Sequence, residues 1–478
     1  MKNNSVTKQI FWFSLINYIG VAVGIVSTLY IYPENPEFLG IIRMVESFSQ
    51  VIFPLILIGA SQALVHFYPT LSVENKNRLF LYSLYSVLVN SVLAFGLIFL
   101  IASLFDFEFK SLVWLALPLG ISIAFNEVFK RQSLNLQKIA FPSFFEKIIP
   151  KITLPLIFIL VGIHFIQEKQ GVWIFVLSYI LILFLTGIYT LKKDKTRWDS
   201  GFRKVFENFS KKEYFRYSLF AFTGSLGSLL AFRIDTIMLG FLGYEMKEIG
   251  IYNIGVLVAS TLIIPATGIF AINSPVISEL VKQNKIKELS SKYKENAKLL
   301  FAIGAVLYSC VFLGINDLFS LLPAKENLLQ AVPILLVLGL GMVINMGTGF
   351  NSEIITFSKY YRFNVIAILV MIVLNIGLNL LFVLQFKMGM IGVAYSSFIS
   401  ISVFNLLKTF YIKQKIGILP FDKKYLQLFS VIISVGILVY FLPTLTSHFW
   451  NFALKSGLCL VLNLILIYKL NIIGRKDY

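Results

Sequence analysis

Fourteen long apolar segments restrict this chain to one class of fold. Each can cross a bilayer as a helix, which needs about 20 predominantly apolar residues. These segments raise the hydrophobic share to 57% and the mean hydropathy to +0.81, with 14% charged residues. A soluble domain carries about 25% charged residues. The chain is therefore predicted to be an all-α polytopic membrane protein, which excludes a soluble enzyme, a disordered scaffold and a disulfide-rich secreted protein.

Short polar connections separate the segments. The segments are residues 10–32, 44–67, 79–104, 112–134, 144–164, 172–191, 216–243, 249–275, 297–322, 328–350, 361–384, 390–412, 424–446 and 449–469. The first is too long for the apolar core of a signal peptide, and no small-residue cleavage motif follows it. We therefore expect it to be retained as a membrane span.

Basic residues divide the connecting loops into two sets. When charges near segment ends, such as Lys408, are counted with the adjoining loop, the two tails and the loops after even-numbered segments hold 34 of the 42 Lys and Arg residues. The loops after odd-numbered segments hold seven. The remaining basic residue, Arg233, lies inside a segment. The positive-inside rule then predicts that both termini are cytoplasmic. The net charge of +18 reflects orientation at an anionic membrane surface, so we expect no nucleic-acid partner.

The longest polar connection, residues 192–217, holds nine basic residues and separates two halves of six segments each. Its apolar residues recur at helical spacing and predict an amphipathic helix on the cytoplasmic membrane surface, with a plain basic loop as the alternative. These residues are Phe202, Val205, Phe206 and Phe209. A weak repeat supports the division, because the residues around Gly40 resemble those around Gly250, at an offset of 210 residues.

Four regions follow from this division. We predict an N-terminal lobe at residues 1–191, a basic cytoplasmic linker at 192–217 and a C-terminal lobe at 218–412. Residues 413–478 are predicted to form two accessory spans and a cytoplasmic tail.

Motifs for catalysis, nucleotide hydrolysis and metal binding are absent from the sequence. It has no G-x-x-x-x-G-K-S/T phosphate loop and no H-E-x-x-H or G-x-S-x-G motif. Its three histidines are scattered, and Cys310 and Cys459 each lie alone in an apolar segment, where a thiol usually acts as a small hydrophobe. We therefore expect a transporter with no cofactor and no metal rather than an enzyme.

Two ionisable residues, Arg233 and Asp235, lie inside the seventh segment. Charges at membrane depth mark either a transport pathway or a buried ion pair. At two positions apart they point about 200° apart on a helix, so each needs a partner on another helix. Arg233 can bind a phosphate if it faces a central cavity. Asp235 is a candidate for coupling to an ion gradient or for a structural ion pair.

Further charged candidates lie at segment ends, where either a pathway residue or an ordinary boundary charge is expected. The complete set of substrate-pathway candidates is Arg233, Arg43, Lys130, Arg131 and Lys147. The complete set of candidates for coupling or for a structural ion pair is Asp235, Glu46, Glu127 and Glu353. Arg43 and Glu46 are three positions apart, so a local surface pair is the alternative for them.

Three runs of residues resemble a known family. They are residues 233–240 (Arg-Ile-Asp-Thr-Ile-Met-Leu-Gly), 249–252 (Ile-Gly-Ile-Tyr) and 275–278 (Pro-Val-Ile-Ser), with Gly-Val-Ala at 392–394 as a fourth match. They resemble bacterial polysaccharide-transport flippases of the O-antigen type, in the multidrug/oligosaccharidyl-lipid/polysaccharide exporter superfamily. The resemblance covers essentially the whole chain in length, number of spans and layout.

The resemblance implies two six-helix lobes in a V around a central cavity, with two further C-terminal helices. It implies that the substrate is an undecaprenyl-diphosphate-linked oligosaccharide, the repeat unit of O-antigen, capsule or exopolysaccharide. The protein would move this lipid across the bacterial inner membrane by alternating access. A proton or sodium gradient would be the energy source, and a polymerase and other glycan-assembly proteins would be its partners.

The sequence departs from this family in one respect and leaves alternatives open. Few basic residues lie deep in the spans beyond Arg233, so the sequence does not specify a diphosphate site. The first span holds no basic residue, whereas a lipid II flippase is expected to carry more of them in the first two spans. The alternatives are a lipid II flippase, a drug/cation antiporter of the same superfamily and a membrane enzyme of glycan assembly. Such an enzyme would need a large outer loop, and the sequence predicts none.

Overall fold

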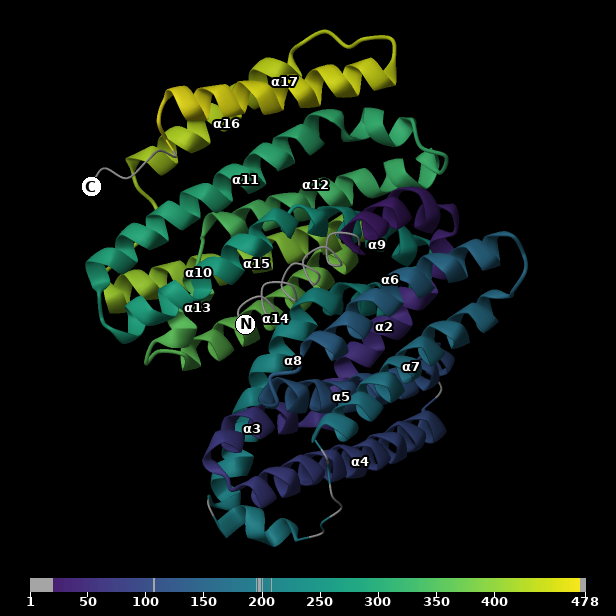
Figure 1. The fold of residues 1–478 in the computed structure, drawn as a ribbon. Coiled ribbons are helices and arrows are strands. Elements are labelled where there is room, and N and C mark those ends of the chain that lie inside the picture. Colours follow the sequence, from purple (N-terminus) through teal and green to yellow (C-terminus); the bar gives the residue numbers. More distant parts are fainter. Residues whose placement is uncertain are drawn as a thin grey trace, which may run out of the picture. The chain divides into compact units, whose positions relative to one another are not determined.

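The computed structural model describes residues 20–472 apart from 106–107, 195, 197–198, 200 and 208, and it describes the side chains of these residues except 223–232 and 271 (Figure 1). All regular elements in this described part are helices, and no strand occurs there. Eleven of the described helices are long and apolar enough to cross a membrane. The chain is therefore a helical multi-pass membrane protein, as its apolar segments predict.

The chain forms two compact units. Unit 1 consists of residues up to Ser27, Glu37–Gly240 and Glu245–Gly250, and unit 2 consists of the remainder. The helices of unit 1 are α2 (Pro36–Leu57), α3 (Ala60–Phe67), η3 (Tyr68–Thr70), α4 (Val73–Leu104), α5 (Lys110–Asn135), α6 (Ala140–Gly162), α7 (Glu168–Asp194), η4 (Phe202–Glu207) and α8 (Lys211–Phe241). Helix α9 (Met246–Thr261) begins in unit 1 and continues in unit 2.

Unit 2 contains the later helices. They are α10 (Ile264–Lys282), α11 (Ile286–Ser320), α12 (Lys325–Gly347), α13 (Asn351–Phe357), α14 (Arg362–Leu380), η5 (Leu381–Gln385), α15 (Gly389–Ile416), α16 (Lys423–Tyr440) and α17 (His448–Lys469). The last part of the first predicted span contains η1 (Ser27–Ile31), and η2 (Tyr32–Glu34) joins that span to α2. Residues 10–19 of that first span lie outside the described part of the chain.

Two predicted spans are interrupted rather than continuous. The second span breaks between α2 and α3, where Gly59 has a positive φ of 74°. The eighth breaks between α9 and α10, and Pro265 lies in the first turn of α10. Proline lacks a backbone N–H, so it fits the first turn of a helix, where that group has no intrahelical partner. Apolar length alone does not reveal such breaks, because both halves are equally apolar.

The two copies of the sequence repeat meet within unit 1. A Cβ atom at Gly40 of α2 would overlap the carbonyl oxygen of Met246 and lie 3.2 Å from the backbone nitrogen of Gly250. Small residues at a helix contact allow two backbones to approach closely in a membrane. The glycine shared by both copies therefore marks a tight contact between the starts of α2 and α9.

Helix α8 packs within unit 1, whereas the predicted C-terminal lobe begins at residue 218. A Cβ atom at Gly59 would overlap the carbonyl oxygen of Ser218, so α8 lies directly against the start of α3. The rings of Phe67 and Tyr214 lie 5.8 Å apart at the same contact. These contacts join residues distant in sequence, so the linker position does not reveal the boundary between the units.

The basic linker docks on unit 1 instead of forming the predicted amphipathic helix on the membrane surface. Between the end of α7 at Asp194 and the start of α8 at Lys211, its described regular element is the short 3-10 helix η4. Within it, Phe206 packs edge-on against Tyr82 at 5.3 Å, and Val205 is fully buried. Phe209 stacks on Phe67 at 4.2 Å. The apolar residues that gave the helical spacing therefore complete an aromatic core of the protein.

The accessory helix α17 packs tightly on α11. A Cβ atom at Gly314 would overlap the Ser456 hydroxyl, and the Cys310 thiol contacts the Ser456 carbonyl oxygen at 3.5 Å. The thiol of Cys310 also contacts that of Cys459, so the two cysteines lie together rather than alone. The packing of α17 on α11 brings the two cysteines together, and their spacing in the sequence does not show this.

Candidate functional site

Arg43, Glu46 and Arg233 form an ion cluster in unit 1. Arg43 Nη1 donates to Glu46 Oε2 at 2.5 Å, and Arg233 Nη2 donates to Glu46 Oε1 at 2.8 Å. The side chains are 11%, 12% and 28% exposed, so the carboxylate is shielded between two guanidinium groups. Arg233 thus has the partner on another helix that its position predicts. The cluster of α2 and α8 is buried, unlike a local surface pair, and carries one net positive charge.

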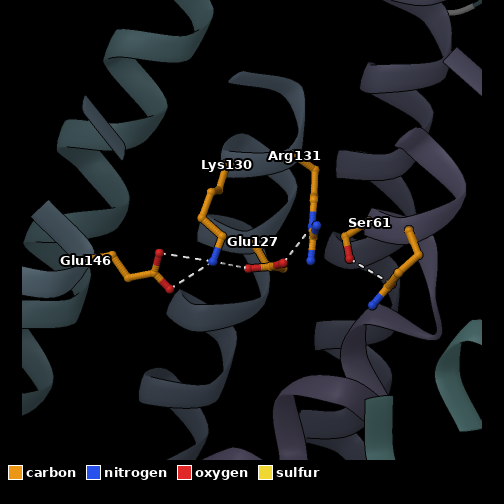
Figure 2. Close-up of polar contacts among 6 residues, drawn as sticks. Ser61, Glu127, Lys130, Arg131 and Glu146 are labelled. Atoms are coloured by element: carbon orange, nitrogen blue, oxygen red, sulfur yellow. Dashed lines mark hydrogen bonds and ion pairs between the residues drawn. The ribbon is translucent and has the colours of Figure 1, made fainter. Parts of the chain in front are cut away.

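A second ion cluster lies on α5 and α6. Lys130 Nζ is 2.6 Å from Glu127 Oε2 and 2.9 Å from Glu146 Oε1, and Arg131 Nε donates to Glu127 Oε1 at 2.8 Å. Figure 2 shows Glu127 between Lys130 and Arg131, with Glu146 on the other side of Lys130. Two cations and two carboxylates alternate, so the cluster is neutral. Lys130 and Arg131 are therefore engaged by carboxylates, and Glu127 is engaged by cations.

A cavity of about 460 Å³ lies beside the second cluster. It is lined by Lys130, Ile139, Ser143, Glu146, Lys147, Pro150, Lys151 and Tyr179. Lys147 and Lys151 are one turn apart on α6, so they share a helix face. The lining contains three lysines against one glutamate, which gives an excess of positive charge. The partly buried lining residues Ser143 and Tyr179 were not predicted, because a hydroxyl in an apolar segment gives no distinctive signal.

Tyr179 of α7 connects the cavity to the first cluster. Its phenol lines the cavity and lies within electrostatic range of Glu46, Arg43 and Arg233 as well as of Glu146. Substrate-pathway candidates from α2, α5, α6 and α8 are thereby brought into one polar region of unit 1. The basic groups of this region can bind an anion by charge-assisted hydrogen bonds.

Two predicted residues remain, Asp235 on α8 and Glu353 in unit 2. Asp235 is 9% exposed in α8 and has a polar interaction of its own. Glu353 lies half-buried on α13 in unit 2. There it is within electrostatic range of Lys408, which is only 1% exposed.

The sequence interpretation counted Lys408 as a loop charge, and this assignment is wrong. The polar residues Asn405, Lys408 and Thr409 share one buried face of α15, and their 3–4 spacing could have revealed it.

An apolar groove of about 650 Å³ lies between α11, α12 and α16 in unit 2. Its lining consists of Phe301, Ala305, Tyr308, Ser309, Phe312, Leu313, Leu340, Val343, Ile344, Phe429, Ile432, Ile433, Gly436, Ile437, Tyr440 and Phe441. A groove of this volume with aromatic walls suits an apolar chain and offers almost nothing to a charged group. Among the described residues, no cluster of three His, Cys, Asp or Glu side chains can hold a metal ion.

Known proteins resemble this chain both in sequence and in fold. The model of a family described as polysaccharide biosynthesis protein matches residues 35–300. The fold is similar to that of a lipid II flippase, MurJ, in an inward closed conformation, with a TM-score of 0.75 and 18% identity over 96% of this chain and 99% of that one. No curated protein matches the sequence.

Two further solved structures share the fold. An inward-facing MATE multidrug resistance transporter of the MOP superfamily has a TM-score of 0.62 and 15% identity over 84% of this chain and 98% of that one. A MOP superfamily transporter from Pyrococcus furiosus has a TM-score of 0.51 and 16% identity over 86% and 93%. Because the family match covers more than half of the chain, the protein belongs to the polysaccharide biosynthesis protein family, and it has the fold of the multidrug/oligosaccharidyl-lipid/polysaccharide exporter superfamily.

Proposed function

We propose that the protein is a flippase for polyprenyl-diphosphate-linked oligosaccharides, moving O-antigen, capsule or exopolysaccharide repeat units across the bacterial inner membrane by alternating access. Both termini would be cytoplasmic, and a polymerase and other glycan-assembly proteins would act with it. The observation that carries the proposal is the lysine-lined cavity of unit 1, which Tyr179 connects to the Arg43–Glu46–Arg233 cluster. Family membership supports the glycan as the substrate class.

A diphosphate fits the charge of this region. Lys147 and Lys151 contribute two ammonium groups to the cavity, and the arginine cluster adds one net charge within electrostatic range of Tyr179. Lys130 lies at the same cavity but is engaged by Glu127 and Glu146. Hydrogen bonds between ionised partners contribute about 1.5–3 kcal/mol each. We expect the two α6 lysines to contribute to binding of the diphosphate.

The apolar groove of unit 2, taken by itself, suits a polyprenyl chain. Its aromatic and aliphatic walls match an isoprenoid, and its volume is about 650 Å³. Transport of a cationic drug finds less support, because Glu46 and Glu127 are each engaged by two basic side chains. One similar structure is a lipid II flippase, so lipid II is the other substrate to test.

Transport is measured with purified protein in liposomes that contain a fluorescent polyprenyl-diphosphate oligosaccharide, by quenching the label exposed on the outer leaflet. Lipid II and a cationic drug are tested in parallel. We expect the oligosaccharide lipid to be translocated. Transport of lipid II alone would change the substrate assignment, and transport of the drug alone would overturn the flippase proposal.

The first site prediction concerns Lys147 and Lys151. We expect Lys147→Gln and Lys151→Gln each to lower substrate affinity about tenfold, because each removes a charge-assisted hydrogen bond of at least about 1.4 kcal/mol. Lys138→Gln is the matched control, since Lys138 is exposed in the loop between α5 and α6 and does not line the cavity. Binding is measured by titrating the labelled lipid into detergent-solubilised protein. Equal losses in all three variants would exclude the cavity as the diphosphate site.

The second site prediction concerns the groove. Gly436 lines it, and a Cβ atom there would meet no atom within 4 Å, so Gly436→Trp fills the groove without a backbone clash. We expect this variant to lose most transport of a long-chain polyprenyl substrate and to keep transport of a short-chain analogue. Gly457→Trp on α17 is the control, because Gly457 also has open space but lies outside the lining. Equal loss for both chain lengths would contradict a role in binding the chain.

A further inference from the structure

Unit 2 contains a buried lysine that none of the roles above uses. Lys408 of α15 is 1% exposed, and its amine lies 3.7 Å from the centre of the Phe404 ring, in a cation–π arrangement. The same nitrogen donates a hydrogen bond to the Ser352 hydroxyl of α13. Ionisable groups inside a membrane protein are costly and usually functional. Lys408 therefore needs an explanation beyond helix packing.

The surroundings of Lys408 contain little opposing charge. Among the described residues, no carboxylate oxygen lies within 4.0 Å of its amine. Glu353 of α13 is the carboxylate that acts on it at longer range, and Tyr293 of α11 lies within electrostatic range of Glu353. Helix α12 contributes the uncharged Asn345 to this region. A buried ion pair, the usual way to hold a lysine in the interior, is therefore not formed here.

Uncharged polar groups hold α13 against α15 beside this lysine. Asn405 Nδ2 of α15 donates to Asn345 Oδ1 at 3.2 Å, and Asn405 Oδ1 accepts hydrogen bonds from the Thr348 hydroxyl and from Asn351 Nδ2, both at 3.1 Å. The chain between α12 and α13 turns at Gly349, which has a φ of 64° and packs on Ala297. Helix α13 is thus a separate short element, fixed to α15 by this amide network and by Lys408.

The Ser352 hydroxyl suits both charge states of the amine. It accepts a hydrogen bond from the ammonium, and by rotating its hydrogen it donates one to the neutral amine. The Phe404 ring, in contrast, attracts only the ammonium. A change of charge at Lys408 therefore leaves its hydrogen bond in place but alters the attraction between the amine and the ring.

We propose that Lys408 is a proton-exchange site, and that gain and loss of its proton couples a proton gradient to movement of α13 against α15. The N–H bond of the ammonium breaks and the nitrogen keeps the electron pair, while a bridging water takes this proton and gives one of its own to the Glu353 carboxylate, because the two side chains are too far apart for direct transfer. The O–H bond formed on Glu353 then breaks as the carboxyl group passes its proton to bulk water. Burial raises the pKa of Glu353, which favours its service as the intermediate acceptor. The coupling rests on the proposed transport function, whereas the exchange of the proton does not.

The test separates proton exchange from positive charge. Lys408→Arg keeps the charge but does not release a proton, because a guanidinium stays protonated in proteins. Lys408→Gln removes the charge, and Glu353→Gln removes the acceptor. Lys413→Arg is the matched control, because Lys413 is exposed on the same helix. Transport of the labelled lipid is measured in liposomes with and without an imposed pH gradient, and the melting temperature is measured from pH 5 to 9 without substrate.

We expect the gradient to stimulate transport by the wild type and by Lys413→Arg, and to have no effect on Lys408→Arg or Glu353→Gln. We expect the melting temperature of Lys408→Gln relative to the wild type to change with pH. Gradient stimulation retained in Lys408→Arg, or parallel melting profiles, would overturn the proton site. If Lys408 variants fail to fold, stimulation retained in Glu353→Gln would overturn the relay. Absence of any lipid transport refutes the proposed function. In that case the pH dependence of the melting temperature still tests whether Lys408 exchanges a proton.

Discussion

Glu46→Gln is expected to lower the free energy of unfolding by about 3–5 kcal/mol, because it leaves the buried guanidinium of Arg43 and the partly buried guanidinium of Arg233 without their shared carboxylate. Arg233→Gln is expected to be much milder for stability, since the Arg43–Glu46 pair survives it. Its effect falls on transport instead. The net charge of the cluster drops from +1 to zero, and we expect loss of most transport at a normal protein level.

The two variants are expected to respond differently, since Glu46→Gln loses stability and Arg233→Gln loses transport, and this difference separates a structural role from a role in the substrate pathway. Stability is measured by thermal unfolding in detergent and protein level by quantifying the chain in membranes, with transport measured in liposomes. Arg216→Gln is the control for loss of an arginine from the same helix, outside the cluster. Loss of the protein in Arg233→Gln would assign this arginine a structural role. Full transport in that variant would remove it from the substrate pathway.

Gly59→Ala is expected to cost about 2–5 kcal/mol and to lower accumulation of the folded protein. The φ of 74° costs a residue with a Cβ about 1–2 kcal/mol by itself. The added methyl group would also overlap the carbonyl oxygen of Ser218, and neither backbone can yield without separating α3 from α8. Overpacking of this kind typically adds about 1–3 kcal/mol.

Variants at two other glycines separate the conformational cost of a positive φ from the steric cost of the added methyl group. Gly243 has a φ of 83° but open space around it, so Gly243→Ala carries only the conformational cost. Gly96, within α4, has open space and no positive φ, so Gly96→Ala is expected to stabilise the helix slightly. Thermal unfolding of the three variants is compared. Equal losses at Gly59 and Gly243 would contradict the close contact between α3 and α8.

The apolar segments gave the fold class and nearly all the helices, because a span must be apolar over its whole length. Their breaks at Gly59 and before Pro265 escaped this criterion, since both sides of each break are apolar. The repeat around Gly40 and Gly250 was visible in the sequence, but their contact was not. The linker phenylalanines were identified as an apolar face and assigned to the wrong surface. Helical spacing shows that a face is apolar and leaves open what covers it.

The candidate site shows the same limit. The sequence identified Arg43, Glu46 and Arg233 as charges that need an explanation, and tertiary structure decided that they bind one another. Lys408 was assigned to a loop because it lies near the end of a predicted span, and burial against α13 made it an interior charge. The free energy of placing a side chain inside a membrane depends on its residue type, so the sequence alone indicates which residues are unfavourable there. Charge pairing depends on distance between helices, which only packing sets.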